Sequence, residues 1–276
     1  MRVLVIGKAK TGTTALVSLI RQALEPCKLV MEPKSVLEFG AASLQRSSNE
    51  AIKIIYEHFR NQPRHLNALV HQEFGFSIDK VVFITRDIRD EVISRLLYLP
   101  KVLRDKALSN GRKEREWKRW VCVLEEKERC PSEVSFKDLC SSFQDIFQVD
   151  AWADVIDAIR LGQAYEQYIS SGVVRDRYVQ SYEAMIRNET SGLAKYLDLT
   201  LPSDVMAVEL GAFKYTKRSG ASGNWKSFFT EHDVALLRPM IESSLGHGIY
   251  EDWELESVAR LDSAAYSGYV KRVAMG

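Results

Sequence analysis

The sequence predicts an α/β fold of three layers, built around a central and mainly parallel sheet. Short apolar runs alternate with segments of helical periodicity along the chain, which is typical of βαβ units. The run at residues 80–85 (KVVFIT) joins β-branched and aromatic side chains without alternation, as expected of a strand buried on both faces. The 276 residues, 46% of them hydrophobic, suffice for one sizeable core, so we expect a single domain over residues 1–276.

The remaining elements follow from the same patterns in chain order. We expect strands at residues 2–7, 27–31, 66–70, 80–85 and 177–180. We expect helices at residues 13–23, 49–61, 89–97 and 183–197. From residue 101 to 133 the chain is strongly charged and its apolar positions recur at helical spacing. This segment predicts a helical insertion over about residues 101–149.

Composition excludes several classes of partner. Lys and Arg number 38 against 37 Asp and Glu, which gives a formal net charge of +1. Such a balance provides no overall field to hold nucleic acid or an anionic membrane, so we expect neither. The four cysteines lack the spacing of metal ligands and indicate reduced thiols. No signal peptide is visible and no apolar run approaches the roughly 18 residues that span a bilayer, so we expect a cytoplasmic protein without a transmembrane segment.

The loop after the first strand has the composition of a phosphate cradle. It reads Gly-Lys-Ala-Lys-Thr-Gly-Thr-Thr from residue 7, and a helix is expected directly after it. Such a loop presents backbone N–H groups and the positive end of a helix dipole to an anion. Its binding residues are Lys10, Thr11, Gly12, Thr13 and Thr14. Lys10 stands before Gly12, whereas a Walker A loop has its lysine directly after the second glycine.

A second anion-binding group follows the strand at residues 80–85. Arg86 stands at the carboxyl end of that strand, where open α/β sheets bind ligands, and Ser94 follows eight residues later. Either residue also has a purely structural explanation. Arg86 could pair with Asp87 or Asp90, and Ser94 could bond back to a helix carbonyl.

A third group lies in the segment at residues 218–230 (RSGASGNWKSFFT), which is rich in glycine and serine. Arg218, Ser219 and Gly220 offer a guanidinium, a hydroxyl and an unobstructed backbone amide. An ordinary surface loop would have a similar composition. A fourth signal is Tyr182, which follows the expected strand at residues 177–180 and directly precedes the expected helix at residues 183–197.

Four motifs stand in order between residues 7 and 230: Lys-Thr-Gly-Thr-Thr, Arg-Asp-Ile-Arg-Asp with its serine, Tyr-Glu, and Arg-Ser-Gly-x-x-Gly-Asn-Trp-Lys. In order and spacing they resemble the sulfotransferases that use 3'-phosphoadenosine 5'-phosphosulfate, a family with a P-loop-like phosphosulfate-binding loop. The resemblance implies that Lys10 stabilises the leaving oxygen and that the loop threonines hold the 5'-phosphate. It implies that Arg86, Ser94 and residues 218–220 hold the 3'-phosphate. Tyr182 would lie against the adenine, and no metal would be needed.

The chain departs from the family pattern at three positions. Ser219 replaces a lysine and Asn224 replaces an aspartate in the last motif, and Ala184 replaces the acid that follows Tyr-Glu. Loss of the lysine would weaken the grip on the 3'-phosphate unless Lys217 substitutes for it.

The general base is open at the level of the sequence. Many relatives carry Lys-x-His after a strand that precedes the arginine, and here His71-Gln-Glu follows the expected strand at residues 66–70. The match assigns Glu73 as the base and leaves His71 as the other candidate. Glu32 and Glu38, after the second strand, are a third option by resemblance to the heparan enzyme.

We therefore expect a sulfotransferase that moves a sulfuryl group to a hydroxyl or amine of a glycan, lipid or small molecule and releases 3',5'-adenosine bisphosphate. The divergent residues 34–61 and 101–149 would recognise the acceptor. The basic cluster at residues 112–119 either holds an anionic acceptor or is a solvated helix face. The alternatives are a P-loop kinase, which the position of Lys10 disfavours, and a non-catalytic nucleotide-binding protein on the same fold.

Overall fold

The computed structural model describes residues 1–33, 38, 49–61, 63–71, 77–106, 113–205, 218–246 and 250–275. The chain divides into two compact units. The first, here the sheet unit, consists of Met1–Arg86 and Ala164–Lys214. The second, the helical unit, consists of Asp87–Gln163 and Tyr215–Gly276. Each unit is therefore assembled from two stretches of chain that are distant in sequence.

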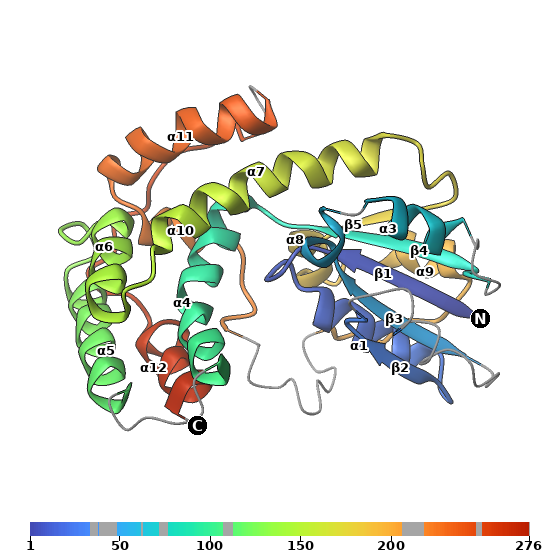
Figure 1. Cartoon of the computed structure of the whole chain (residues 1–276), viewed down its shortest axis with the longest axis horizontal. Helices are drawn as coiled ribbons and strands as arrows, with labels where there is room; N and C mark the ends of the chain where they lie inside the picture. Colours follow the sequence, from blue (N-terminus) through green and yellow to red (C-terminus); the bar gives the residue numbers. More distant parts are fainter. Residues whose placement is uncertain are drawn as a thin grey trace. The chain divides into compact units, whose positions relative to one another are not determined.

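The sheet unit contains five strands, all paired in parallel, in the order β2-β3-β1-β4-β5 (Figure 1). The strands are β1 (Arg2–Gly7), β2 (Lys28–Met31), β3 (Glu50–Ile55), β4 (Lys80–Thr85) and β5 (Tyr178–Ser181). β1 lies in the middle of the sheet, and its residues after Arg2 are all buried. The predicted α/β fold around a central parallel sheet is confirmed.

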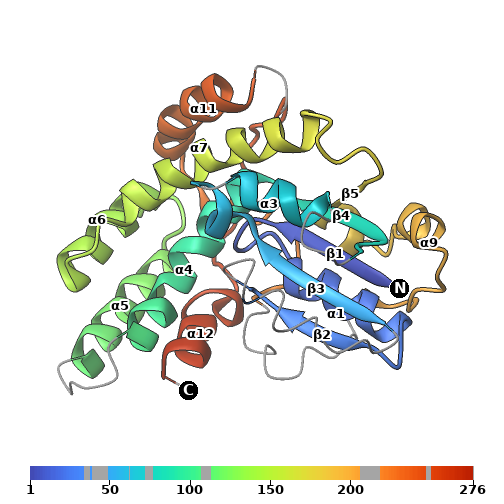
Figure 2. The ribbon, with the colours of Figure 1, turned by 45° about the vertical axis from the view of Figure 1, so that its right-hand side comes forward.

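Helices cover both faces of this sheet. They are α1 (Thr13–Ala23), η1 (Tyr56–Phe59), α3 (Pro63–Val70), α8 (Tyr182–Ile186), α9 (Ser191–Leu197) and the end of α7 (Ala151–Ser170), from Ala164 onward. On one face, Val5 packs in a core with Leu16 of α1 and with buried side chains of α8 and α9. On the other face, the hydroxyl of Tyr165 in α7 donates to the carbonyls of Ile6 (2.8 Å) and Ile84 (3.1 Å). Figure 2 shows α3 on the opposite side of the sheet from α1.

The structure corrects the sequence prediction at β3. Residues 49–61 were expected as a helix, but they form β3 and the short helix η1. Glu50 and Lys53 give this segment a helical composition, yet both are buried in the strand. Each is paired with an opposite charge: Arg2 Nε lies 2.7 Å from Glu50 and Lys53 Nζ lies 2.6 Å from Glu32. Pairing between neighbouring strands thus overrides the local helix propensity.

The structure also corrects the prediction for residues 66–70, which belong to α3 and not to a strand. Pro63 occupies the first helical position, where its missing N–H loses no hydrogen bond. Leu66 and Leu69 are fully buried and lie three residues apart, as on one face of a helix.

Most of the other elements agree with the prediction within small shifts, but the helix expected at residues 89–97 is longer and extends over Ile88–Lys106 as α4. β1, α1 and β4 have the expected bounds, and the bounds of β2 and β5 shift by one residue. The helix expected at residues 183–197 is instead two helices, α8 and α9. They are separated near Asn188, whose φ of 61° is incompatible with a continuous right-handed helix.

The helical unit surrounds an aromatic-rich core. Its elements are α4 (Ile88–Lys106), α5 (Lys113–Arg129), α6 (Phe136–Phe147), the first part of α7, α10 (Trp225–Phe228), α11 (Glu231–Leu245), η4 (Ser263–Ala265), α12 (Ser267–Val270) and η5 (Lys271–Met275). The largest fully buried aromatic side chains here are Trp120, Trp225, Tyr269, Phe136, Phe143 and Phe228. α5 and α6 pack together (Figure 2), so the described residues of the segment expected as a helical insertion are largely helical. Among the described helices, none is both long and apolar enough to cross a membrane.

Candidate functional site

The loop between β1 and α1 curls tightly against Tyr182. Lys10 and Gly12 both have positive φ, 68° and 92°. A Cβ at Gly12 would lie 2.4 Å from Cδ2 of Tyr182, so a side chain cannot be accommodated there without a shift. α1 begins directly after Gly12. The backbone N–H groups of its first turn have no intrahelical acceptor, and the helix dipole favours an anion at this end.

Arg86 joins this loop to Tyr182. Its Nη1 donates to the carbonyl of Lys10 at 2.8 Å. Its guanidinium carbon lies 4.4 Å from the centre of the Tyr182 ring. The Nε of Arg86 is shielded from solvent and has no hydrogen-bond partner among the described residues. Three elements that the sequence assigned to one site therefore lie in contact within the sheet unit, and one donor of the arginine remains for a ligand.

These residues lie at the carboxyl ends of neighbouring strands. The Lys10 loop follows β1, Arg86 follows β4 and Tyr182 follows β5. From β1 the chain first builds β2 and β3 on one side, and then adds β4 on the other side. The order of strands therefore reverses between β1 and β4, and open α/β sheets bind their ligands at that reversal.

The structure adds residues that the sequence analysis missed. Lys53, buried in β3, donates to the hydroxyl of Thr14 (2.8 Å) and to the carboxylate of Glu32 (2.6 Å). The carboxylate of Glu57 accepts the N–H of Ala9 at 2.8 Å. Lys53 of β3 thus connects Thr14, in the first turn of α1, with Glu32, and Glu57 of η1 holds the loop after β1 at Ala9. The incorrect helix prediction for residues 49–61 concealed Lys53, because only the strand register brings it beside α1.

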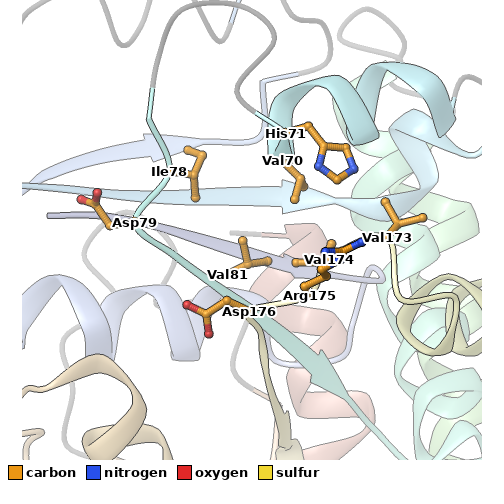
Figure 3. A pocket seen from close by; sticks show the side chains of 9 residues that line it. All are labelled: Val70, His71, Ile78, Asp79, Val81, Val173, Val174, Arg175 and Asp176. Atoms are coloured by element: carbon orange, nitrogen blue, oxygen red, sulfur yellow. The ribbon is translucent and has the colours of Figure 1, made fainter.

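His71 lies at the other end of the sheet. It follows α3 and lines a cavity of about 620 Å³ together with residues around the amino ends of β4 and β5 (Figure 3). Asp79 precedes β4 and Asp176 precedes β5, whereas Lys10 follows the carboxyl end of β1. The assignment of His71 as a base depended on a strand at residues 66–70, and that reason no longer holds. Glu73, its companion in that assignment, lies outside the described residues.

The helical unit contains the other predicted anion-binding residues. Ser94 is buried in α4. The guanidinium carbon of Arg218 lies 5.5 Å from the centre of the Tyr266 ring, and its Nε, Nη1 and Nη2 are shielded from solvent without a hydrogen-bond partner among the described residues. Gly220 has a φ of 66°, and the hydroxyl of Ser219 accepts the N–H of Ala221 at 3.3 Å. Lys217, the possible substitute for the missing lysine, lies outside the described residues.

The first turn of α4 binds the segment that follows Arg218. Asp90, which is fully buried, accepts the N–H of Gly223 at 2.7 Å and the N–H of Trp225 at 3.1 Å. Two motifs that are more than 130 residues apart in sequence therefore form one structure within the helical unit.

The neighbouring Arg89 strengthens this connection. Its guanidinium carbon lies 3.8 Å from the ring centre of Trp225, 4.7 Å from that of Tyr250 and 4.9 Å from that of Trp253. Asp87 pairs with the same guanidinium at 2.7 Å. Burial, followed by the negative charge of Asp87, raises the pKa of Tyr250. Arg89 is thus a structural residue, surrounded by aromatic rings and neutralised locally.

The unsatisfied donors fit an anionic ligand. Buried guanidinium nitrogens without acceptors are rare in native proteins, and phosphate oxygens satisfy them well. Arg86 Nε in the sheet unit and the Arg218 nitrogens in the helical unit are of this kind. Among the described residues, no group of three or more His, Cys, Asp or Glu side chains is arranged to hold a metal ion.

The likeness of this chain to known proteins lies in its structure. No protein-family model and no curated protein matches this chain. A solved structure that the chain resembles is mouse sulfotransferase SULT7A1 complexed with PAP, with 14% sequence identity and a TM-score of 0.49, over 90% of this chain and 86% of the other. A likeness of this degree carries no argument about activity, so the case for a function rests on the residues described above.

Proposed function

We propose that the protein is a sulfotransferase that takes its sulfuryl group from 3'-phosphoadenosine 5'-phosphosulfate. The observation that carries the proposal is the contact of Arg86 with both the Lys10 carbonyl and the Tyr182 ring. This contact brings together, at one edge of the sheet, the Lys10 loop proposed for the 5'-phosphate, Arg86 proposed for the 3'-phosphate and Tyr182 proposed for the adenine. The proposal assigns Thr11, Gly12, Thr13 and Thr14 of the sheet unit to the 5'-phosphate. It assigns Ser94, Arg218, Ser219 and Gly220 of the helical unit to the 3'-phosphate, as the family resemblance implies.

The position of Lys10 argues against a P-loop kinase. A kinase of that class needs a lysine directly after the second glycine to reach the β- and γ-phosphates, together with magnesium. Here Thr13 follows Gly12, and Lys10 lies before that glycine in a left-handed conformation, with its carbonyl held by Arg86.

The proposed reaction is an in-line displacement at sulfur. The acceptor oxygen or nitrogen forms a bond to sulfur, and the bond from sulfur to the bridging oxygen breaks. The electron pair of that bond stays on the 5'-phosphate, where the Lys10 ammonium neutralises the developing charge. The hydroxyl of Thr14 accepts from Lys53, so its own proton remains available to a phosphate oxygen. The proton of the acceptor passes to a carboxylate base.

We propose Glu32 as that base. It follows β2 at the carboxyl edge of the sheet and is bonded to Lys53, which also bonds Thr14 of the phosphate loop. This chain of contacts keeps a carboxylate close to the loop in which Lys10 lies. Glu73 and His71, the two candidates from the sequence, stay as the competing assignments, and the Glu32 and His71 variants described in the Discussion test Glu32 against His71.

The finer features of the function follow the same proposal. We propose that residues 1–276 act as one sulfotransferase domain in the cytoplasm and use a hydroxyl or amine of a small molecule, glycan or lipid as acceptor. The helical insertion at about residues 101–149 would help to recognise it. No metal, nucleic acid or membrane partner is part of the proposed reaction.

The test is calorimetry of the purified protein with three nucleotides. We expect 3',5'-adenosine bisphosphate to bind at least tenfold more tightly than AMP, because charged hydrogen bonds to one extra phosphate contribute about 1.5–3 kcal/mol each. ATP with magnesium should bind more weakly than the bisphosphate. Equal affinities for AMP and the bisphosphate would contradict the proposed donor, and tight magnesium-dependent ATP binding would support the kinase.

A further inference from the structure

The segment at residues 218–223 has little within itself to fix its conformation. Gly220 and Gly223 have φ of 66° and 75°, a region that glycine samples freely. Among the described residues, the hydrogen bonds that residues 218–223 make with one another or with the residues directly after them are few. They join Ala221 N–H to Ser219 Oγ at 3.3 Å, Asn224 Nδ2 to the Ala221 carbonyl at 3.1 Å and Lys226 N–H to the Gly223 carbonyl at 3.1 Å. Contacts from outside the segment must therefore select the conformation in which Arg218 presents its guanidinium.

Asp90 supplies these contacts. Its two carboxylate oxygens bind separate N–H groups, Oδ2 that of Gly223 and Oδ1 that of Trp225. A carboxylate that accepts two backbone N–H groups makes shorter and stronger bonds than a neutral acceptor does. The residue is 0% exposed, so water does not compete for these positions. The ring of Trp225 is held in addition by Arg89.

We propose that Asp90 is a positioning residue for the 3'-phosphate: by fastening Gly223 and Trp225 to the first turn of α4, it sets residues 218–223 in the conformation that presents Arg218 and the Gly220 amide to the ligand. This inference rests on the proposed function, because it takes the ligand of Arg218 to be the 3'-phosphate. Asp90 itself does not touch the nucleotide in this account. It acts through the backbone of the segment.

The expected effect follows from the population of the competent conformation. If only a fraction of molecules holds the segment correctly, the measured dissociation constant rises in inverse proportion to that fraction. Asp90→Asn keeps the shape of the side chain but replaces one acceptor oxygen by an NH₂ group. That group cannot accept a hydrogen bond, so one of the two backbone N–H groups loses its acceptor. We expect the affinity for 3',5'-adenosine bisphosphate to fall by about tenfold or more. The affinity for AMP, which has no 3'-phosphate, should change by less than about twofold.

Asp233→Asn is the matched control in the same unit. Asp233 is also buried and also accepts backbone N–H groups, from Phe136 (2.8 Å), Lys137 (3.0 Å) and Thr230 (2.9 Å). Both variants should lose thermal stability, since each leaves buried N–H groups without an ionised acceptor. Only Asp90→Asn should lower the affinity for the bisphosphate relative to AMP.

A double-mutant cycle with Arg218→Ala tests the proposed route. If Asp90 acts through Arg218 and the Gly220 amide, then Asp90→Asn should cause a smaller loss of bisphosphate affinity once Arg218 is already alanine, because only the Gly220 contact remains to be lost. Independent, additive losses would overturn the positioning role. If Asp90→Asn does not fold, Gly223→Ala serves instead: it has room for a Cβ but strains the left-handed backbone, and it should also lower the bisphosphate affinity selectively.

The two possible failures are distinguishable. A wild-type protein that binds AMP and the bisphosphate equally overturns the proposed function, and the positioning role with it. A wild-type protein that prefers the bisphosphate, with Asp90→Asn and Gly223→Ala retaining the full preference, overturns the positioning role alone.

Discussion

Replacing Arg86 by alanine separates two roles that the structure gives to this side chain. The first role lies within the protein: Arg86 bonds the Lys10 carbonyl at 2.8 Å and covers the Tyr182 ring at 4.4 Å. A hydrogen bond from a charged donor contributes about 1.5–3 kcal/mol and a cation–π contact about 0.5–2 kcal/mol. Their loss should loosen the loop after β1 and weaken the binding of every 5'-phosphorylated nucleotide, AMP included.

The second role is the proposed bond to the 3'-phosphate, which only the bisphosphate can make. At about 1.5–3 kcal/mol, its loss corresponds to roughly 10- to 150-fold in affinity. The quantity to measure is therefore the ratio of the dissociation constants for AMP and 3',5'-adenosine bisphosphate, because the effect on the loop is shared and cancels. We expect this ratio to fall roughly 10- to 150-fold in Arg86→Ala and by less in Arg86→Lys, which keeps the charge.

Calorimetry of the wild type and the variants with both nucleotides provides the ratio. Arg187→Ala is the control, because Arg187 is exposed and pairs with Glu189 at 2.8 Å. Its ratio should equal that of the wild type. If Arg86→Ala weakens both nucleotides in parallel and leaves the ratio unchanged, then Arg86 only braces the loop, and the assignment to the 3'-phosphate is refuted.

Three further predictions concern turnover and stability. With an acceptor found by screening, Lys10→Ala should lower kcat far more than it weakens binding of the product nucleotide, and a variant that binds poorly but turns over normally would show that Lys10 only anchors. Glu32→Gln should lower kcat by roughly 10²- to 10⁴-fold with nucleotide affinity retained, while His71→Asn stays near the wild type; the reverse result would return the base to His71. Burial lowers the pKa of Lys127 from 10.5 to about 8, so between these values the unfolded chain binds more protons than the folded one, and stability rises with pH. In urea unfolding, the free energy of unfolding of the wild type should rise by about 2 kcal/mol relative to that of Lys127→Met between pH 7.5 and 9.5. A difference in unfolding free energy that does not change with pH would contradict the burial of an ionisable amine.

The sequence was most informative where the signal is local. β1, the loop after it and α1 are consecutive, and glycine, lysine and threonine occur there at the spacing that the loop requires. β4 is recognisable because a strand buried on both faces needs a continuous apolar run, and Arg86 follows it directly. Residues that end or follow a parallel strand all lie at one edge of the sheet, so the order of motifs was enough to predict that Lys10, Arg86 and Tyr182 meet.

The sequence was misleading where burial involves charges. In β3 all six residues are buried, including Glu50 and Lys53, and a segment with glutamate and lysine between apolar residues has the composition of an amphipathic helix. The strand is stabilised by Arg2, which comes from β1, and by Glu32, which follows β2. The sequence pattern within residues 49–61 does not indicate these partners. A strand was therefore assigned to residues 66–70, which form α3, and the reasoning that made His71 a candidate base depended on that strand.

The residues of the proposed site also differ in how well the sequence predicts them, and the reason is chemical. A phosphate can be held by whatever short loop offers N–H groups and a cation, so its residues are close in sequence and readable from it. The groups that hold these loops in shape are different: Lys53 connects Thr14 with Glu32, and Asp90 reaches Gly223 across 133 residues. Such residues are buried charges that their partners stabilise: Glu32 pairs with the Lys53 ammonium, and two backbone N–H groups donate to the Asp90 carboxylate. A motif can indicate which ligand a loop binds without indicating which residues hold that loop in place. Those residues are best sought among the buried charges beside the loop whose partners are distant in sequence.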